Sequence, residues 1–206
     1  QMFKITTLDF DNIEKDESIF FDDKVKNVQA GNEIGVKSVL FKSIEDIKKN
    51  FLGEILMNDN KKFIEIAIEL SKKSMYPYGS IIVKNGEIIG RCDVDVPVSK
   101  TGFSHAELRA IENAIEHIGG HLCAEGGKGC TIYSSCEPCA MCMGAILYTG
   151  IERLVYAATL EDSKRCVNEI LAKAEDVADV CKNRKIQIIK ELHRDKAVEV
   201  LKNWTL

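Results

Sequence analysis

The chain has 206 residues, a formal net charge of −4, and a composition that is 45% hydrophobic and 29% charged. These values are typical of a folded globular protein and exclude the polar, weakly hydrophobic composition of disordered chains. The acidic balance gives no overall positive field that would attract a phosphate backbone, so nucleic acid is a possible but less favoured partner.

No segment reaches the roughly 18 apolar residues that a membrane span requires. The first residues, QMFKITTLDFDN, lack the apolar run and cleavage site of a signal peptide. We therefore expect a cytoplasmic protein without a membrane partner. Three of the eight cysteines, Cys136, Cys139 and Cys142, lie close together in the sequence. In a reducing compartment such clustering indicates metal binding or redox chemistry.

The first part of the chain alternates strand and helix, which is an α/β pattern. The predicted elements are strand 18–21, helix 24–34, strand 37–41 and helix 43–51. Gly53 is the expected stop of the last helix. The polar run Met57-Asn-Asp-Asn60 predicts a boundary. We therefore divide the chain into residues 1–57, a small N-terminal α/β extension, and residues 58–206.

The second part begins with an amphipathic helix from Lys61 that ends before Tyr76-Pro77. A β-hairpin over 79–92 follows, because Asn85-Gly86 suits a tight turn. The next predicted elements are helix 104–118, strand 130–134, helix 138–148, strand 153–158, a helix over about 163–179, strand 185–190 and helix 195–204. Because helices separate the later strands, we expect a mostly parallel sheet covered by helices on both faces.

A candidate zinc site combines two of these elements. Cys139 and Cys142 stand at i and i+3 on a helix predicted to begin at Pro138, so both sulfurs lie on one face of its first turn. The helix N-terminus favours the thiolate form. His105 opens another predicted helix and supplies a third ligand. Three protein ligands with an open fourth position are typical of catalytic zinc.

Glu107 lies two residues after His105, so it can reach the metal site without binding the metal. Ser104-His-Ala-Glu107 also fits a capping box, in which both side chains only satisfy backbone donors. Cys139 and Cys142 alone could be a redox pair or half of a structural zinc site. Cys136 and Cys139 form a further possible ligand pair, although Pro138 favours a helix that leaves Cys136 outside it.

Residues 60–206 resemble the cytidine deaminase-like superfamily, in particular its guanine deaminases, tRNA adenosine deaminases and fungal cytosine deaminases. The matching runs are Tyr78 to Gly86, Ser104-His-Ala-Glu107, Tyr133 to Ile146 and Leu192 to Trp204. The resemblance implies a three-layer α/β/α sandwich with a mixed, mostly parallel sheet. It also implies Zn²⁺ held by His105, Cys139 and Cys142, acid–base catalysis by Glu107, and a homodimer.

The substrate implied by the resemblance is an amino-bearing nucleobase or nucleoside. The segment Tyr156 to Asp162 is most similar to guanine deaminases, so we favour a purine-type substrate. Residues implied in substrate binding are Asp93, Asp95, Phe103, Ser135, Glu137 and Asp162. The chain departs from the family in two places. Asp93-Val94-Asp95 stands where an asparagine is common, and Gly102-Phe103-Ser104 replaces Asp-Pro-Thr.

Three alternatives to the deamination of a purine-type substrate remain at this point. They are a tRNA or nucleic-acid adenosine substrate, a cytosine substrate, and a non-catalytic zinc module.

Residues 18–51 resemble the final portion of haloacid dehalogenase-like phosphatases, on the basis of Phe20-Phe-Asp22-Asp23, Asn27 and Gly35. In that family the paired acids help to hold magnesium. The nucleophilic Asp-x-Asp strand and catalytic lysine of the family belong upstream of this portion, and the sequence does not contain them. We therefore interpret residues 1–57 as a truncated segment that docks on the deaminase and has no phosphatase activity of its own.

Overall fold

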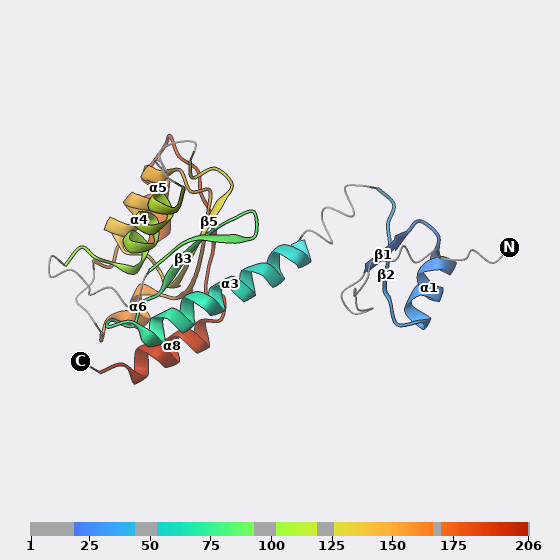
Figure 1. Ribbon diagram of the computed structural model, residues 1–206, viewed down its shortest axis with the longest axis horizontal. Helices are drawn as coiled ribbons and strands as arrows, with labels where there is room; N and C mark the ends of the chain where they lie inside the picture. Colours follow the sequence, from blue (N-terminus) through green and yellow to red (C-terminus); the bar gives the residue numbers. More distant parts are fainter. Residues whose placement is uncertain (1–18, 44–52, 93–101, 119–125, 167–169, 206) are drawn as a thin grey trace. The chain divides into compact units, whose positions relative to one another are not determined.

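The computed structural model describes residues 19–43, 53–92, 102–118, 126–166 and 170–205, without the side chains of residues 53–56 (Figure 1). The chain divides into two compact units, Gln1–Leu56 and Met57–Leu206. None of the helices in the described ranges is both long enough and apolar enough to cross a membrane.

The first unit contains a parallel pair of strands joined by a helix. Strand β1 (Ile19–Asp22) pairs with β2 (Lys37–Leu40), and α1 (Val25–Glu33) connects them. The Asp22 carboxylate accepts hydrogen bonds from the Asn27 side-chain amide, which lowers the pKa of Asp22. The predicted helix over 43–51 lies outside the described residues apart from Ser43. The haloacid dehalogenase-like origin of this unit stays a prediction.

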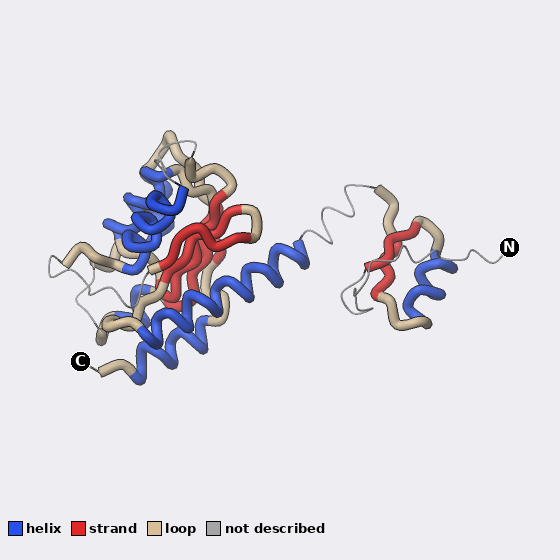
Figure 2. The backbone as a smooth tube through the Cα atoms, in the orientation of Figure 1, coloured by secondary structure: helices blue, strands red, loops and turns tan. Residues whose placement is uncertain are grey.

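The second unit is built on a five-stranded mixed sheet (Figure 2). Its strands are β3 (Ser80–Lys84), β4 (Glu87–Arg91), β5 (Cys130–Cys136), β6 (Arg153–Ala158) and β7 (Gln187–Ile189), in the spatial order β4-β3-β5-β6-β7. Strand β3 is antiparallel to both β4 and β5, whereas β5, β6 and β7 are parallel to one another. The predicted hairpin is confirmed. Its turn residues Asn85 and Gly86 have φ of 53° and 81°.

Helices cover both faces of this sheet, as Figure 1 shows. One layer holds α3 (Gly53–Lys73) and α8 (Arg194–Asn203). The other holds α4 (Ala106–Ile118), α5 (Ala140–Thr149) and α7 (Ala174–Val180). The side chains of consecutive strand residues point to opposite faces of the sheet, so they pack into two different hydrophobic cores. Ile81 and Tyr133 pack with α3 and α8, whereas Ile82 and Ile132 pack with α4, α5 and α7. The predicted three-layer α/β/α fold is confirmed.

Two sequence predictions about the start of this unit are wrong. Helix α3 begins at Gly53 rather than Lys61, so Gly53 is a helix start and not a stop. The polar run 57–60 lies inside α3 instead of forming a turn. Asn60 is only 1% exposed, and its side-chain oxygen accepts hydrogen bonds from the Tyr133 hydroxyl at 2.9 Å and from Arg153 at 3.3 Å. These partners satisfy the side-chain oxygen of Asn60, whereas its buried Nδ2 has no hydrogen-bond partner among the described residues.

The helix predicted over about 163–179 is also wrong. The described residues form two separate helices around this range, α6 (Leu160–Ser163), which ends where the predicted helix begins, and α7, which matches only its last part. Thr159 forms a capping box with Asp162, which fixes the start of α6. The carboxylate of Glu137 accepts the backbone N–H of Ala174, the first residue of α7, at 3.0 Å. Long-range capping of this kind leaves no periodic pattern in the local sequence.

Candidate metal centre

His105, Cys139 and Cys142 come together although they lie on two different helices. The Nδ1 atom of His105 lies 3.6 Å from the Cys139 sulfur and 3.4 Å from the Cys142 sulfur. One ligand atom from each residue lies within 4.8 Å of the others, close enough to hold one metal ion. Within the described part of the chain, this is the one such group of His, Cys, Asp and Glu side chains.

The N-termini of α4 and α5 place these ligands. The His105 carbonyl accepts the N–H of Arg109 at 3.0 Å, and the Cys139 carbonyl accepts the N–H of Met143 at 2.8 Å. Each residue therefore stands at the cap of its helix, with Cys142 in the first turn of α5. Both helices begin later than predicted, at Ala106 and Ala140. The positive ends of two helix dipoles thus face the cluster and favour anionic sulfur.

A hydrogen bond between the thiols of Cys139 and Cys142 shifts their pKa values in opposite directions. A hydrogen bond from Cys142 is the main cause that lowers the pKa of Cys139 to about 4, and the His105 ring lowers it further. The same bond, together with burial, raises the pKa of Cys142. Both hydrogen bonds favour the thiolate form of Cys139, which is the form in which sulfur binds zinc.

Glu107 lies beside the cluster and is only 6% exposed. Its Oε1 accepts a hydrogen bond of 2.7 Å from the Ser134 hydroxyl. The charge and hydrogen bonding of the Glu107 carboxyl both help to raise the pKa of Cys142, which places this carboxyl next to that sulfur. Burial raises the pKa of Glu107 itself. Glu107 is thus a carboxyl group at the metal cluster, bonded to Ser134 rather than acting only as a helix cap.

Cys136 does not join the ligand group. It is buried at the end of β5, and its thiol donates to the Thr159 carbonyl at 3.5 Å. Burial and the nearby carboxylates raise the pKa of Cys136 well above its usual value. The geometry therefore favours the pair Cys139 and Cys142 over the pair Cys136 and Cys139.

Two of the residues predicted to bind substrate have their polar atoms engaged within the protein. The Ser135 hydroxyl accepts the backbone N–H of Gly79 at 2.9 Å. The carboxylate oxygens of Glu137 accept the N–H groups of Leu160 at 3.2 Å and Ala174 at 3.0 Å. These contacts give Ser135 and Glu137 a structural role next to the metal ligands.

The other residues predicted to bind substrate are Asp162, Phe103, Asp93 and Asp95. The Asp162 carboxylate binds Arg194, and this bond is the main cause that lowers the pKa of Asp162 to about 2. Phe103 is 66% exposed, and its carbonyl accepts the N–H of His105 at 2.9 Å. Asp93 and Asp95 lie outside the described residues.

Ser134 was missed by the sequence analysis. Its position in β5 identifies it as a strand residue, and nothing in the local pattern distinguishes it from Ser135 or predicts its contact with Glu107. Only the packing of α4 against the sheet reveals that contact.

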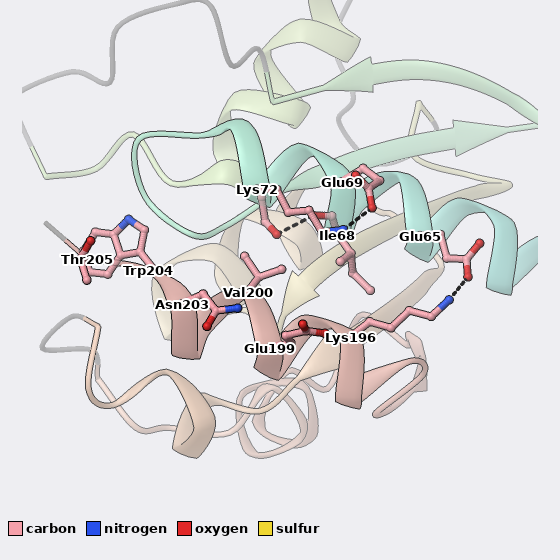
Figure 3. A pocket seen from close by; sticks show the side chains of 11 residues that line it. Glu65, Ile68, Glu69, Lys72, Lys196, Glu199, Val200, Asn203, Trp204 and Thr205 are labelled. Atoms are coloured by element: carbon pink, nitrogen blue, oxygen red, sulfur yellow. Dashed lines mark hydrogen bonds and ion pairs between the residues drawn. The ribbon is translucent and has the colours of Figure 1, made fainter.

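A separate hollow of about 660 Å³ lies between α3 and α8 (Figure 3). Ile68, Val200 and Trp204 contribute apolar surface to it. Around them stand charged side chains, including Lys196, whose amine pairs with Glu65. None of the metal-cluster residues lines this hollow.

Comparison with known proteins identifies the region around the cluster. Residues 57–158 match the family model described as the cytidine and deoxycytidylate deaminase zinc-binding region. Guanine deaminase from Bacillus subtilis is 38% identical over 87 residues, which are 42% of this chain and 53% of that protein. Cytosine deaminase from Candida albicans is 35% identical over 102 residues, 47% of this chain and 65% of that protein.

The tRNA-specific adenosine deaminase of Aquifex aeolicus is 33% identical over 100 residues, 47% of this chain and 64% of that protein. The chain thus spans between half and two thirds of these relatives. A solved mutant of NE0047 in complex with 8-azaguanine matches with a TM-score of 0.61 and 25% identity, over 69% of this chain and 82% of that one. Residues 57–158 of this chain are therefore similar to a cytidine and deoxycytidylate deaminase zinc-binding region.

Proposed function

We propose that this chain is a zinc-dependent hydrolytic deaminase that releases ammonia from an amino-bearing nucleobase or nucleoside. One observation carries the proposal, namely the convergence of His105, Cys139 and Cys142 at two helix N-termini beside the buried carboxyl of Glu107. The match of residues 57–158 to a deaminase zinc-binding region supports it.

The donor set fits zinc. One imidazole nitrogen and two sulfurs are ligands that zinc prefers, and three protein ligands leave a fourth position open. The thiolate character of Cys139 favours metal binding without an added base. When bound, zinc supplies Lewis acidity and an activated water nucleophile.

Glu107 is the residue that we assign to proton transfer. Replacing an amino group on an aromatic ring requires a proton at a ring nitrogen and a second proton on the departing amine. A single carboxyl group can carry one proton from the attacking water to the ring nitrogen. It can then carry the second proton of that oxygen to the amine, which leaves as ammonia. The buried carboxyl of Glu107 lies at the cluster and is not one of its three ligands, which suits this role.

A purine-type base, similar to guanine, is the substrate that we favour. Support comes from the guanine deaminase relative and from the structural neighbour that binds 8-azaguanine. Phe103, exposed and two residues before His105, is the described side chain that we assign to contact the substrate ring. A screen of zinc-loaded protein for ammonia release from nucleobases, nucleosides and nucleotides tests this choice, and release from cytosine alone would contradict it.

Adenosine in tRNA is the second candidate substrate, supported by the tRNA-specific relative. Salt dependence separates the two classes. Activity on a polynucleotide falls steeply as salt rises, because binding releases counterions from phosphates. Activity on a free base changes little. The acidic net charge of −4 favours the free base.

We propose further that the protein is a cytoplasmic homodimer. The support is the outer face of α5, where Tyr148 is 77% exposed and Gly144 faces open space, although the helix is apolar on all sides. Such an apolar surface helix suits burial against another chain. Light scattering measures the mass directly, and a monomer at micromolar concentration would contradict the dimer.

For residues 1–57 we propose a haloacid dehalogenase-like segment without phosphatase activity. The parallel pair β1 and β2, and the bond between Asp22 and Asn27, support the assignment. Incubation of the full chain with magnesium and p-nitrophenyl phosphate tests it, and measurable hydrolysis would contradict the lack of activity.

The decisive test of the deaminase proposal is Glu107→Ala. This variant should retain stoichiometric zinc and lose ammonia release by at least about two orders of magnitude, the usual contribution of general acid–base catalysis. Unchanged turnover would exclude the catalytic role of Glu107. If the wild-type protein binds zinc tightly but releases no ammonia from any compound in the screen, the non-catalytic zinc module is the better description.

A further inference from the structure

Ser134 lies on the central strand β5, where its hydroxyl is buried against the metal region. The residue is 1% exposed, and in the register of the sheet it stands between Ser80 of β3 and Tyr156 of β6. Ile132, two residues earlier, packs in the core under α4 and α5. Because strand side chains alternate, Ser134 points toward the same helices, one step nearer the start of α4.

The hydroxyl of Ser134 has one specific partner in that direction. It donates a hydrogen bond of 2.7 Å to Oε1 of Glu107, and both groups are buried. This bond restrains one oxygen of the carboxyl, while the carboxyl as a whole lies beside the Cys142 sulfur. A free glutamate side chain has several rotamers, and a short bond to the rigid centre of a sheet selects among them.

From this geometry we infer that Ser134 is a positioning residue, which holds the Glu107 carboxyl in the orientation that proton transfer at the metal cluster requires. Ser134 would contact neither the metal nor the substrate, and it would act only through Glu107. The catalytic part of this inference rests on the proposed deaminase function. The bond between the two side chains does not.

The first test compares Ser134→Ala and Ser134→Thr in the zinc-loaded protein. Loss of a supporting partner of this kind usually costs 10- to 100-fold. We expect kcat of Ser134→Ala to fall by about that factor, with KM changed less than about threefold and zinc stoichiometry retained. Threonine keeps the hydroxyl and should restore most of the activity. Unchanged kcat in Ser134→Ala, or no recovery in a threonine variant that melts at the wild-type temperature, would overturn the inference.

Ser80→Ala is the matched control. Ser80 is equally buried and stands next to Ser134 on β3, but its hydroxyl donates to the Tyr133 carbonyl at 3.0 Å and not to Glu107. This variant removes the same atom from the same layer of the sheet. It should leave kcat within about twofold of wild type. A loss in kcat equal to that of Ser134→Ala would assign the effect to sheet packing and overturn the inference.

A stability cycle in the zinc-free protein tests the bond independently of any activity. The four proteins are the wild type, Ser134→Ala, Glu107→Ala and the double variant. If the two side chains interact, the shift in melting temperature of the double variant should differ from the sum of the single shifts. Additive shifts would overturn the positioning role even in an active enzyme. A non-additive cycle in a protein that releases no ammonia would instead retain the bond and reject the deaminase proposal.

Discussion

The guanidinium of Arg194, at the start of α8, donates two hydrogen bonds of 2.8 and 2.9 Å to the carboxylate of Asp162 in α6. Bidentate geometry of this kind makes an ion pair more specific than most surface pairs. The same carboxylate accepts the backbone N–H and the hydroxyl of Thr159 at 2.9 and 2.8 Å. Asp162 therefore links the cap of α6 to the C-terminal helix α8.

Because of these contacts, we expect wild type and Asp162→Asn to differ in stability by an amount that depends on pH. Folding lowers the pKa of Asp162 to about 2, below the usual value of 3.8. A group with a depressed folded-state pKa stabilises the protein above its unfolded pKa, and the contribution is lost as pH falls toward the folded pKa. Asp162→Asn should therefore unfold at lower urea than wild type between pH 5 and 7. The difference should shrink as pH falls from about 4 to 2.

The control for this prediction is Glu161→Gln, the neighbouring residue. Glu161 pairs with Lys164 in an exposed i,i+3 contact, which contributes little to stability. Its urea midpoint should stay near wild type at every pH. A difference for Asp162→Asn that does not change between pH 5 and 2.5 would contradict the assignment to this carboxylate.

Metal binding should distinguish the cysteines of the Cys136 to Cys142 run. Cys139→Ala removes one of three ligands, so zinc should be lost on dialysis against a weak chelator, as measured by metal analysis. Cys136→Ala removes a sulfur that bonds to the Thr159 carbonyl instead of joining the cluster. It should keep about one zinc per chain. Zinc loss in Cys136→Ala with zinc retained in Cys139→Ala would reverse the ligand assignment.

A substitution of Glu137 should reduce the stability of the protein, because the carboxylate of this residue caps the first residues of both α6 and α7. Glu137→Gln places an amide N–H against one of these backbone donors. Hydrogen bonds to a charged group contribute about 1.5–3 kcal/mol each, so stability should fall by about 2 kcal/mol. Amide hydrogen exchange should accelerate at Leu160 and Ala174 in particular.

Glu175→Gln is the matched control for Glu137. Glu175 lies in α7, one of the two helices that Glu137 caps, but the carboxylate of Glu175 pairs with Lys190 at the surface. Stability should change by less than about 1 kcal/mol. If Glu137→Gln leaves both stability and exchange unchanged, its carboxylate does not hold the two helices.

The fold and the grouping of His105, Cys139 and Cys142 were predictable because both leave local patterns. Asn85-Gly86 marked the hairpin, and the spacing of Cys139 and Cys142 placed two sulfurs on one face of a helix turn. The metal cluster then needed only one further ligand at the start of another helix, and His105 stood there.

The features that the sequence did not predict share a different cause. Asn60 lies buried inside a helix, where Tyr133 and Arg153, more than 70 residues away, donate hydrogen bonds to its side-chain oxygen. The break between α6 and α7 depends on Glu137, which reaches both helices from the end of β5. The role of Ser134 depends on how α4 packs over the sheet. Contacts between distant residues decided each case, and propensity or spacing along the chain does not encode such contacts.

The packing of α4 on the sheet gives the last prediction. Gly90 of β4 lies against α4 so closely that an added Cβ would stand 2.4 Å from the Ala110 carbonyl oxygen and 2.7 Å from the Ala114 nitrogen. Both are backbone atoms, which cannot rotate away. Gly90→Ala must therefore shift α4, the helix that follows His105 and carries Glu107. We expect a stability loss of about 1–3 kcal/mol and weaker zinc binding. Equilibrium unfolding and zinc titration measure the two effects.

Gly144→Ala is the opposite case on the neighbouring helix. Gly144 lies inside α5, and an added Cβ would meet no atom within 4 Å. Alanine is the better helix former, so at concentrations where the chain is monomeric this substitution should stabilise it by about 0.5–1 kcal/mol and leave zinc affinity unchanged. The pair of variants adds one methyl group to each of two glycines. Because only Gly90 touches the backbone of α4, equal effects from both substitutions would contradict the close contact that positions His105 and Glu107.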